Sequence, residues 1–195
     1  MTRIVAGAHG GRRLAVPDGA DTRPTSDRVR EALFSALESR IGVDGSRFAD
    51  LYAGSGAIGL EAYSRGAAHV LLVESGAKAA RTIRDNIVTL RATGSVELLV
   101  SKVDSAVQTA PPAPYDIIFA DPPYAVTDSD VAGMLAGLMA NGWLTEGGVV
   151  VVERAKRSAE PEWPAGLVAD KPRKYGDTTL WYSRHEAAAL PSEPV

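Results

Sequence analysis

The stretch Asp50-Leu-Tyr-Ala-Gly54-Ser-Gly56-Ala-Ile-Gly59 decides the fold, because it joins a short apolar run to a helix-like segment. The apolar run, Phe48 to Tyr52, has the length and composition of a strand buried on both faces. Glycines here allow positive φ angles and let the backbone approach a ligand closely, and the first turn of a helix offers unpaired N–H groups. The sequence therefore predicts a strand, a ligand-binding glycine loop and a helix in succession.

The same alternation of apolar runs and helical segments continues along the chain. Helices are expected over 57–64, 77–92 and 128–140, and further buried strands over 69–74, 96–101, 115–120 and 149–153. Strands that alternate with helices indicate a parallel sheet covered on both faces, with right-handed crossovers. With 195 residues, 45% hydrophobic and 23% charged, the chain is expected to form one compact α/β domain of the doubly wound type.

The two ends of the chain depart from this pattern. Arg3 to Val5 and Arg12 to Val16 flank a glycine-rich turn, which predicts a β-hairpin, and Thr25 is expected to cap a helix that runs to Arg40. Near the other end, 167–170 and 178–182 are expected to form two antiparallel strands joined by a basic turn. The expected organisation is a hairpin and basic arm over 1–24, a main domain over 25–184 and a disordered tail over 185–195.

Composition excludes several classes of protein. No run approaches the roughly 18 apolar residues of a membrane span, and the first residues lack the apolar core of a secretory signal, so a cytoplasmic protein is expected. The absence of cysteine excludes disulfides, thiolate metal sites and a cysteine nucleophile. His9, His69 and His185 show no ligand spacing, and no metal is expected.

The net charge of -3 conceals two basic regions. Residues 1–30 contain six Arg and three Asp, and residues 154–184 contain seven Lys or Arg and four acidic residues, so the remainder is strongly acidic. If the two basic regions share a face, they would attract a polyanion such as a nucleic acid. Scattered, solvated charge is the equally open alternative.

Two carboxylates near the glycine loop bear on the choice of cofactor. Glu74 ends the next strand, where it can accept both hydroxyls of a ribose, and this fits a dehydrogenase as well as an S-adenosylmethionine enzyme. Asp50 would repel a pyrophosphate and attract a cationic amino acid group, which favours S-adenosylmethionine. Asp104 can accept a hydrogen bond from an adenine amino group or, alternatively, cap a helix.

The segment Asp121-Pro-Pro-Tyr124 follows the fourth apolar run directly. The two prolines fix the backbone and leave carbonyl oxygens free to accept. Hydrogen bonds from an exocyclic amino group to Asp121 and to the carbonyl of Pro122 would hold a base for methylation, and Tyr124 can stack on an extruded base. A strand-ending turn is the alternative, but both this segment and the glycine loop are expected at the carboxyl edge of the sheet, where ligands bind.

These motifs together resemble a known superfamily. The string D-L-Y-A-G-S-G, the strand-end Glu74 and D-P-P-Y resemble the Rossmann-like, class I S-adenosylmethionine-dependent amino-methyltransferases. R-I-V-A-G near the start and T-R-P-T-S-D-R-V-R-E-A-L-F, over 22–34, are similar to the bacterial family that methylates the N2 amino group of one guanine, of the 966 type, in 16S ribosomal RNA. The likeness covers roughly residues 3–184 and implies a seven-stranded, mostly parallel sheet with an N-terminal hairpin.

The resemblance also implies roles for individual residues. Cofactor contacts are expected at Asp50, Tyr52, Gly54, Gly56, Glu74 and Asp104, and base contacts at Asp121, Pro122 and Tyr124. RNA contacts are expected at Arg12, Arg13, Arg23, Arg28 and Arg30. The expected substrate is 16S rRNA in the assembled small (30S) subunit, and the protein is expected to be a monomer.

Some alternatives remain open on the residues alone. Arg28 and Arg30 lie two apart on a helix and cannot share a face, so one is expected to bind phosphate and the other to pair with Asp27 or Glu31. D-P-P-Y is shared with DNA adenine-N6 and cytosine-N4 methyltransferases, and a non-catalytic RNA-binding assembly factor is a further alternative. The strand positions of Trp181 and Tyr182 favour core packing over base stacking.

Overall fold

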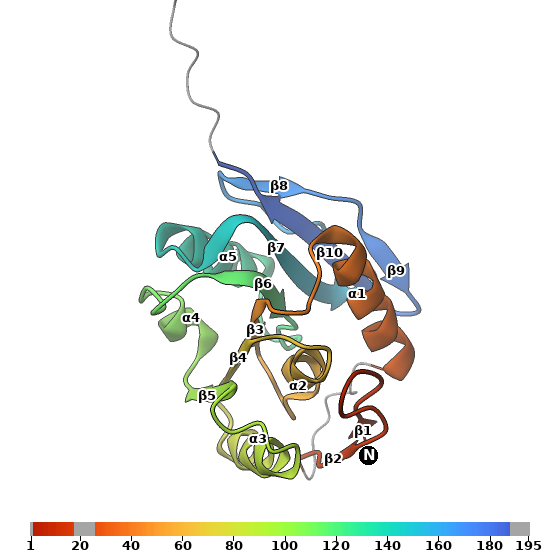
Figure 1. Cartoon of the computed structure of the whole chain (residues 1–195). Helices are drawn as coiled ribbons and strands as arrows, with labels where there is room; N and C mark the ends of the chain where they lie inside the picture. Colours follow the sequence, from red (N-terminus) through yellow and green to blue (C-terminus); the bar gives the residue numbers. More distant parts are fainter. Residues whose placement is uncertain (1, 18–25, 188–195) are drawn as a thin grey trace, which may run out of the picture.

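The computed structural model describes residues 2–17 and 26–187, and its centre is a mostly parallel sheet (Figure 1). The parallel strands, in spatial order, are β5 (Val96–Val100), β4 (His69–Glu74), β3 (Arg47–Leu51), β6 (Tyr115–Ala120) and β7 (Leu144–Ala155). β10 (Thr178–His185) runs antiparallel to β7 and pairs in turn with β8 (Leu167–Ala169) and β9 (Arg173–Tyr175). The expected α/β, doubly wound class is confirmed.

The number of strands differs from the expected seven. Two short strands, β8 and β9, occupy successive stretches along the outer side of β10, so the sheet contains eight strands in the described part of the chain. β9 falls inside the segment that the sequence indicates as a basic turn. Its three residues are too few and too polar to show the period-2 alternation by which a strand is recognised.

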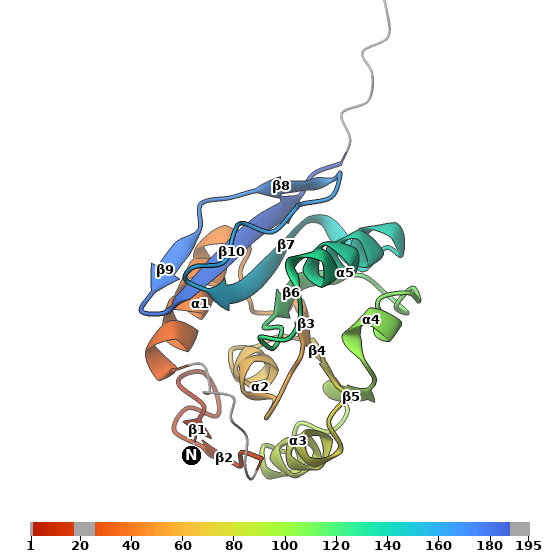
Figure 2. The same ribbon diagram turned by 180° about the vertical axis from the view of Figure 1, so that it is seen from behind.

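Within residues 2–17 and 26–187, five helices cover the two faces of the sheet (Figures 1 and 2). α1 (Asp27–Arg40), α2 (Ala57–Ser64) and α3 (Ala77–Thr89) pack on one face, and α4 (Val103–Ala106) and α5 (Asp128–Ala140) on the other. Successive residues of β3 alternate between the two cores: Phe48 contacts the first group of helices and Ala49 the second. This alternation explains why the strands read as continuous apolar runs.

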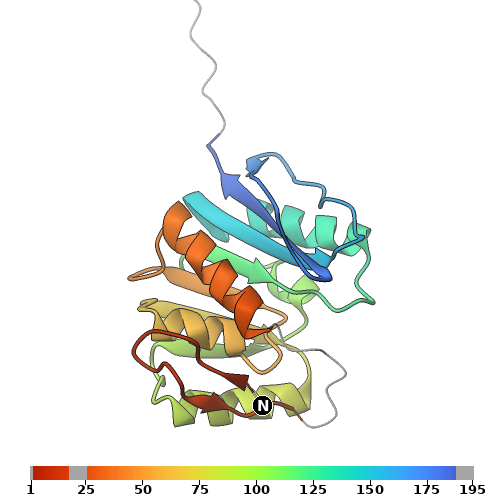
Figure 3. The same cartoon turned by 90° about the vertical axis from the view of Figure 1, so that its right-hand side faces the viewer.

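The N-terminal hairpin lies on the same face as α1 to α3 (Figure 3). Its strands, β1 (Thr2–Arg3) and β2 (Arg13–Leu14), are shorter than expected, but Ile4 and Leu14 are buried in the core. The cap of α1 is Ser26, whose hydroxyl accepts from the N–H of Val29 at 3.3 Å. Thr25 and the expected domain boundary at residue 24 lie outside the described residues.

The C-terminal strand extends further than the sequence indicates. β10 runs to His185, and the N–H of Glu186 donates to the carbonyl of Gly166 at 2.9 Å. The chain therefore remains part of the sheet past residue 184, where a tail was expected to start; residues 188–195 lie outside the described part. Among the residues that the structure describes, no helix has the length and apolar character needed to cross a membrane.

The strand order reverses between β3 and β6. From β3 the chain continues through β4 and β5 on one side, and then through β6 and β7 on the other. At such a switch point the loops that follow the two strands diverge and leave a crevice for a ligand. Leu51 pairs with Ala120, so the loop after β3 and the loop after β6 start side by side.

Candidate active site

The loop that follows β3 has the backbone conformation expected for its glycines. Gly54 and Gly56 have φ angles of 59° and 80°, and Gly56 is the N-cap of α2. A Cβ atom at Gly54 would meet no atom within 4 Å, so this side of the loop is open to a ligand. Tyr52 also has a positive φ, 63°, a conformation that is unusual for a bulky residue and tends to occur at functional sites.

Two carboxylates hold this loop in place. Glu74 accepts from the N–H of Gly54 at 2.8 Å and from the N–H of Gly76 at 2.7 Å, so it ties the loop to the start of α3. Asp50 lies beneath the loop, 1% exposed, and accepts from the N–H of Gly59 at 2.9 Å. Glu74 is part-exposed beside the open side of the loop, whereas Asp50 is placed to act on a ligand only through the backbone that it holds.

The environment of Asp50 favours its protonated form. The pKa of Asp50 is raised to about 7, mainly by burial and in part by the charge of Glu74, against the opposing effect of the hydrogen bond from Gly59. The close packing above it leaves no room for a larger residue, because a Cβ atom at Gly59 would lie 2.2 Å from Leu72. The start of α2 is therefore fixed against both β3 and β4.

The D-P-P-Y segment lies next to this loop, at the end of β6. The N–H of Asp121 donates to the carbonyl of Leu51 at 3.4 Å, so the two loops are in contact at their origins. Pro122 is buried, while the side chain of Tyr124 is 94% exposed and so is available for stacking. Burial raises the pKa of Asp121 well above its ordinary value, and the charges of Glu153 and Asp50 raise it further, against the opposing effect of Arg154.

Arg154, at the end of β7, anchors the far side of the D-P-P-Y loop. Its guanidinium donates to the carbonyl of Val126 at 3.2 and 3.3 Å and to the carboxylate of Asp128 at 2.8 Å. Val126 in turn donates its N–H to the carbonyl of Pro123 at 2.9 Å, which closes the turn around Tyr124. Arg154 and the neighbouring Glu153 were not expected from the sequence. The available signal was their position directly after a buried run, the same signal that marks Asp121.

Asp104 and Tyr52 lie near one another on the other side of the β3 loop. Asp104 is exposed in the first turn of α4, where Lys102 is the cap residue, so the alternative role of Asp104 as a helix cap is wrong. Burial raises the pKa of the Tyr52 hydroxyl to about 12, and the charge of Asp104 contributes to that rise. All six expected cofactor residues therefore belong to the carboxyl ends of β3, β4 and β5 or to the segments that follow them.

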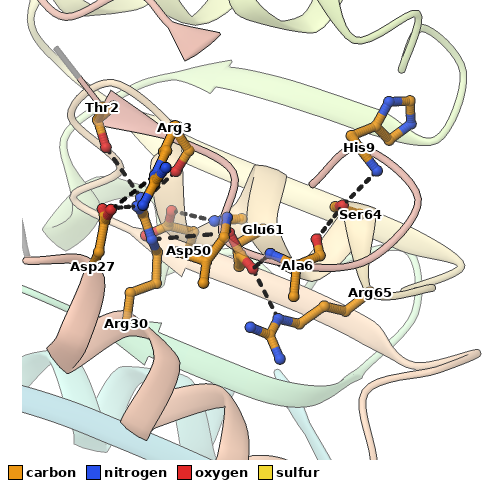
Figure 4. Close-up of polar contacts among 12 residues, drawn as sticks. Thr2, Arg3, Ala6, His9, Asp27, Arg30, Asp50, Glu61, Ser64 and Arg65 are labelled. Atoms are coloured by element: carbon orange, nitrogen blue, oxygen red, sulfur yellow. Dashed lines mark hydrogen bonds and ion pairs between the residues drawn. The ribbon is translucent and has the colours of Figure 1, made fainter. Parts of the chain in front are cut away.

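The five expected RNA contacts fall into different environments. Arg12, Arg13 and Arg28 are exposed, and Arg23 lies outside the described residues. Arg30 is buried, donates to the carbonyl of Arg3 at 2.6 Å and pairs with Asp27 at 2.7 Å (Figure 4). The expectation that Arg30 contacts RNA is wrong, since its side chain is enclosed by the hairpin. The alternative, that one of the two arginines pairs with Asp27, is confirmed.

Two buried polar residues fasten the hairpin beside the site. Glu61 of α2 accepts from the N–H groups of Val5 at 2.7 Å and Ala6 at 3.0 Å (Figure 4). The side-chain amide of Asn86, in α3, accepts from the N–H of Ala15 at 2.8 Å and donates to the carbonyl of Ala15 at 3.0 Å. It also donates to the carbonyl of Ser55 at 3.0 Å. Because Ser55 lies between Gly54 and Gly56, Asn86 connects the hairpin directly to the glycine loop. Neither residue was expected from the sequence.

Comparison with known proteins shows the family of this chain. Residues 2–184 match the family described as "Conserved hypothetical protein 95". "Ribosomal RNA small subunit methyltransferase D" of Escherichia coli strain K12 is 35% identical over 189 residues, which cover 95% of this chain and 90% of that protein. The solved structure of yhhF from Escherichia coli has a TM-score of 0.83 and 33% identity, and the match covers 96% of this chain and 99% of that one.

A more distant structure shows the same fold. The RNA methyltransferase from Salinibacter ruber, solved in complex with S-adenosyl-L-homocysteine, has a TM-score of 0.64 and 16% identity. The match covers 88% of this chain and 98% of that one. At this identity the likeness extends to the arrangement of helices and strands.

Proposed function

Because this chain belongs to the family of conserved hypothetical protein 95, together with ribosomal RNA small subunit methyltransferase D, we propose that it methylates ribosomal RNA. The donor is S-adenosylmethionine, and the acceptor is the exocyclic N2 amino group of a guanine in 16S rRNA, of the 966 type. The observation that carries the proposal is that the glycine loop and the D-P-P-Y segment start side by side at the β3/β6 switch point, where the N–H of Asp121 donates to the carbonyl of Leu51. The donor and the acceptor bind in adjacent loops.

The residues after β3 and β4 fit the proposed cofactor. The open side of Gly54 admits a ligand close to the backbone, and the part-exposed carboxylate of Glu74 lies beside it to accept ribose hydroxyls. Asp104, exposed at the start of α4, is placed to accept from the adenine amino group. When bound, the cofactor supplies an electrophilic methyl group on a sulfonium.

The D-P-P-Y residues position the acceptor. The carboxylate of Asp121 and the carbonyl of Pro122 accept the two N–H bonds of the amino group and direct its nitrogen toward the methyl group. Transfer of the methyl group that the cofactor would supply would break its S–C bond, form an N–C bond and release one proton from the nitrogen. The carboxylate of Asp121, which holds one of these N–H bonds, is placed to accept that proton. Tyr124 stacks on the base once the base has left its helix.

The proposal extends to the substrate, the cellular location and the oligomeric state. We infer that the protein acts on 16S rRNA within the small (30S) ribosomal subunit, in the cytoplasm and as a monomer. Arg12, Arg13 and Arg28 are exposed on the hairpin and at the start of α1, where they are available to contact RNA phosphates.

The test measures transfer of labelled methyl groups to small subunits prepared from cells that lack this protein. The unchanged protein labels the subunits, and mapping of the label places it on the N2 atom of one guanine. Asp121→Ala retains cofactor affinity in a binding titration, while methylation falls at least about 100-fold because an acceptor of the amino group is lost. Label in plasmid DNA but not in the subunits, or full activity of Asp121→Ala, would contradict the proposal.

A further inference from the structure

The hairpin of β9 and β10 lies at the same edge of the sheet as the candidate active site. Ala155, the last residue of β7, pairs with Thr178, and Thr178 pairs with Tyr175 of β9. The turn between β9 and β10 is therefore at the carboxyl end of β7. It is held there by the N–H of Lys156, which donates to the carbonyl of Asp177 at 2.7 Å. Figure 1 shows β9 and β8 at opposite ends of β10.

Cations are concentrated on this hairpin and beside it. Five exposed residues form what we call the β9 basic surface: Lys156, Arg157, Lys171, Arg173 and Lys174. Among the described residues, the cations in ion pairs are Arg3, Arg30, Arg40, Arg65, His69 and Arg154, and so none of these five. The only acidic residue between Lys171 and Thr178 is Asp177. This part of the molecule therefore presents a net positive charge to solvent.

The remaining cations of the basic region 154–184 have internal partners. Arg154 anchors the D-P-P-Y loop, and Arg184 donates to the carbonyls of Gly147 and Arg40 at 3.0 Å each. Internal bonding accounts for these two residues, but not for the five of the β9 basic surface. Long charged side chains that hold no other part of the protein in place are available to bind a partner.

Strand register gives the separation between this surface and the D-P-P-Y segment. Arg173 pairs with Leu180, which pairs with Glu153, and the preceding residue Val152 pairs with Ala120. At about 4.8 Å between neighbouring strands, the backbone of Arg173 is roughly 15 Å from the end of β6. A nucleic acid strand with one base in the site passes this surface within a few nucleotides of that base.

We propose that the β9 basic surface binds the phosphate backbone of ribosomal RNA next to the nucleotide that enters the site. The proposal rests on the function proposed above. The charge favours a polyanion over a protein partner, because the large hydrophobic side chains that are exposed, Val88, Leu99, Val100, Tyr124 and Val168, belong to other segments. Phosphate contacts carry no sequence information; they fix the register of the RNA so that one base faces Asp121.

The test compares two double variants with the same change in charge. Arg173→Gln with Lys174→Gln removes two cations from β9, and Arg81→Gln with Arg84→Gln removes two exposed cations from α3, which packs on β5 at the far side of the sheet. Binding of small subunits is measured over a range of salt concentrations, together with cofactor affinity and methyl transfer.

The fall of log affinity with log salt concentration is expected to be less steep for the β9 variant. The magnitude of the slope decreases by about 1.4, or about 0.7 for each phosphate contact that is lost with single-stranded RNA. The KM of this variant for subunits rises roughly tenfold, while kcat and cofactor affinity are unchanged, because the lost contact is made equally before and during the reaction. The α3 variant keeps the slope of the unchanged protein. Equal slopes for both variants, or no change in either, overturn the inference.

The two proposals fail in different ways. If the β9 variant binds and methylates subunits like the unchanged protein, the inference is wrong and the proposed function stands. If the unchanged protein transfers no methyl group, the proposed function is wrong, and the salt slopes still decide whether this surface binds RNA.

Discussion

Arg154 shows how a single side chain can set the shape of the loop that would hold the substrate base. Its three hydrogen bonds all go to the segment that follows Tyr124, and its side chain is 11% exposed. Bonds from a buried charged donor contribute about 1.5–3 kcal/mol each. Loss of these bonds frees the turn around Tyr124 without opening the glycine loop, because the glycine loop is held by Glu74 and Asn86.

We therefore expect Arg154→Met to lower kcat about 10- to 100-fold, with little change in cofactor affinity. Arg40→Met is the matched control, since Arg40 is also mostly buried and paired with an aspartate, Asp170, but lies at the opposite edge of the sheet. Single-turnover methylation and a cofactor titration on both variants provide the measurement. A parallel loss of cofactor affinity in Arg154→Met would show that the two loops are not held independently.

Asp50 gives a prediction about pH. With its pKa raised to about 7, the folded state binds this proton more tightly than the unfolded chain does. The resulting stabilisation is complete below about pH 4 and is lost as the pH rises through 7. Asp50→Asn, which cannot titrate, should gain stability relative to the unchanged protein over this range, by roughly 4 kcal/mol at the upper end. Urea unfolding at pH 5 and pH 8 measures the gain; an equal difference between the proteins at both values would contradict it.

Residue roles could be predicted where a motif follows a buried run. Asp121, Pro122 and Tyr124 were placed correctly after β6 because the apolar strand before them is unmistakable. The role of Arg30 could not be predicted, because helical spacing shows only that Arg28 and Arg30 point different ways. Which of them is buried depends on the hairpin, whose position on α1 and α2 is a tertiary contact between segments distant in sequence.

At the scale of elements, the hairpin depends on a buried carboxylate. Glu61 is fully buried in α2, accepts from the backbone of Val5 and Ala6, and pairs with Arg65 at 2.8 Å. The helix was predicted with its observed bounds, 57–64, but its apolar composition gives no sign that its one charged residue faces inward. The role of Glu61 as an acceptor for backbone N–H groups can be recognised only in the folded structure, where the hairpin lies against α2.

Glu61→Ala should lower the free energy of unfolding by about 3–5 kcal/mol, because it leaves two N–H groups and the part-buried Arg65 without their acceptor and removes the charge that faces the buried Arg30 at 3.9 Å. Glu97→Ala is the control, since Glu97 is 72% exposed and its contact with His69 spans 3.7 Å. Thermal and urea unfolding of the two variants give the comparison. Equal midpoints for Glu61→Ala and Glu97→Ala would show that the hairpin is held by its apolar contacts alone.

At the scale of the whole molecule, charge is distributed unevenly over a fold that the sequence predicted well. The parallel strands and the helices that cover them followed from periodicity, whereas the split of the last sheet position into β8 and β9 did not. The two basic regions predicted from composition each include exposed arginines and arginines with structural roles, such as Arg13 and Arg30 in the first. Counts of charge could not separate the two groups, because burial decides between them.

If the hairpin and the β9 basic surface contact different phosphates of one RNA, their contributions to salt dependence should add. Arg12→Gln with Arg13→Gln is expected to decrease the magnitude of the slope of log affinity against log salt by about 1.4. The combination with the two β9 substitutions is expected to decrease it by about 2.8. Subunit binding in a salt series measures each. A combined effect no larger than either pair alone would mean that the two surfaces do not hold the RNA at the same time.

The position of β10 has a consequence for synthesis of the chain. β7 lies between β6 and β10, and β10 is formed by residues 178–185, which leave the ribosome after β7. Until they emerge, one side of β7 has no partner, and its run of valines is an exposed edge open to association with other nascent chains. The sheet is therefore completed only after residues 178–185 have emerged, and chaperone contact should be longest on nascent chains from which β7 has emerged and β10 has not.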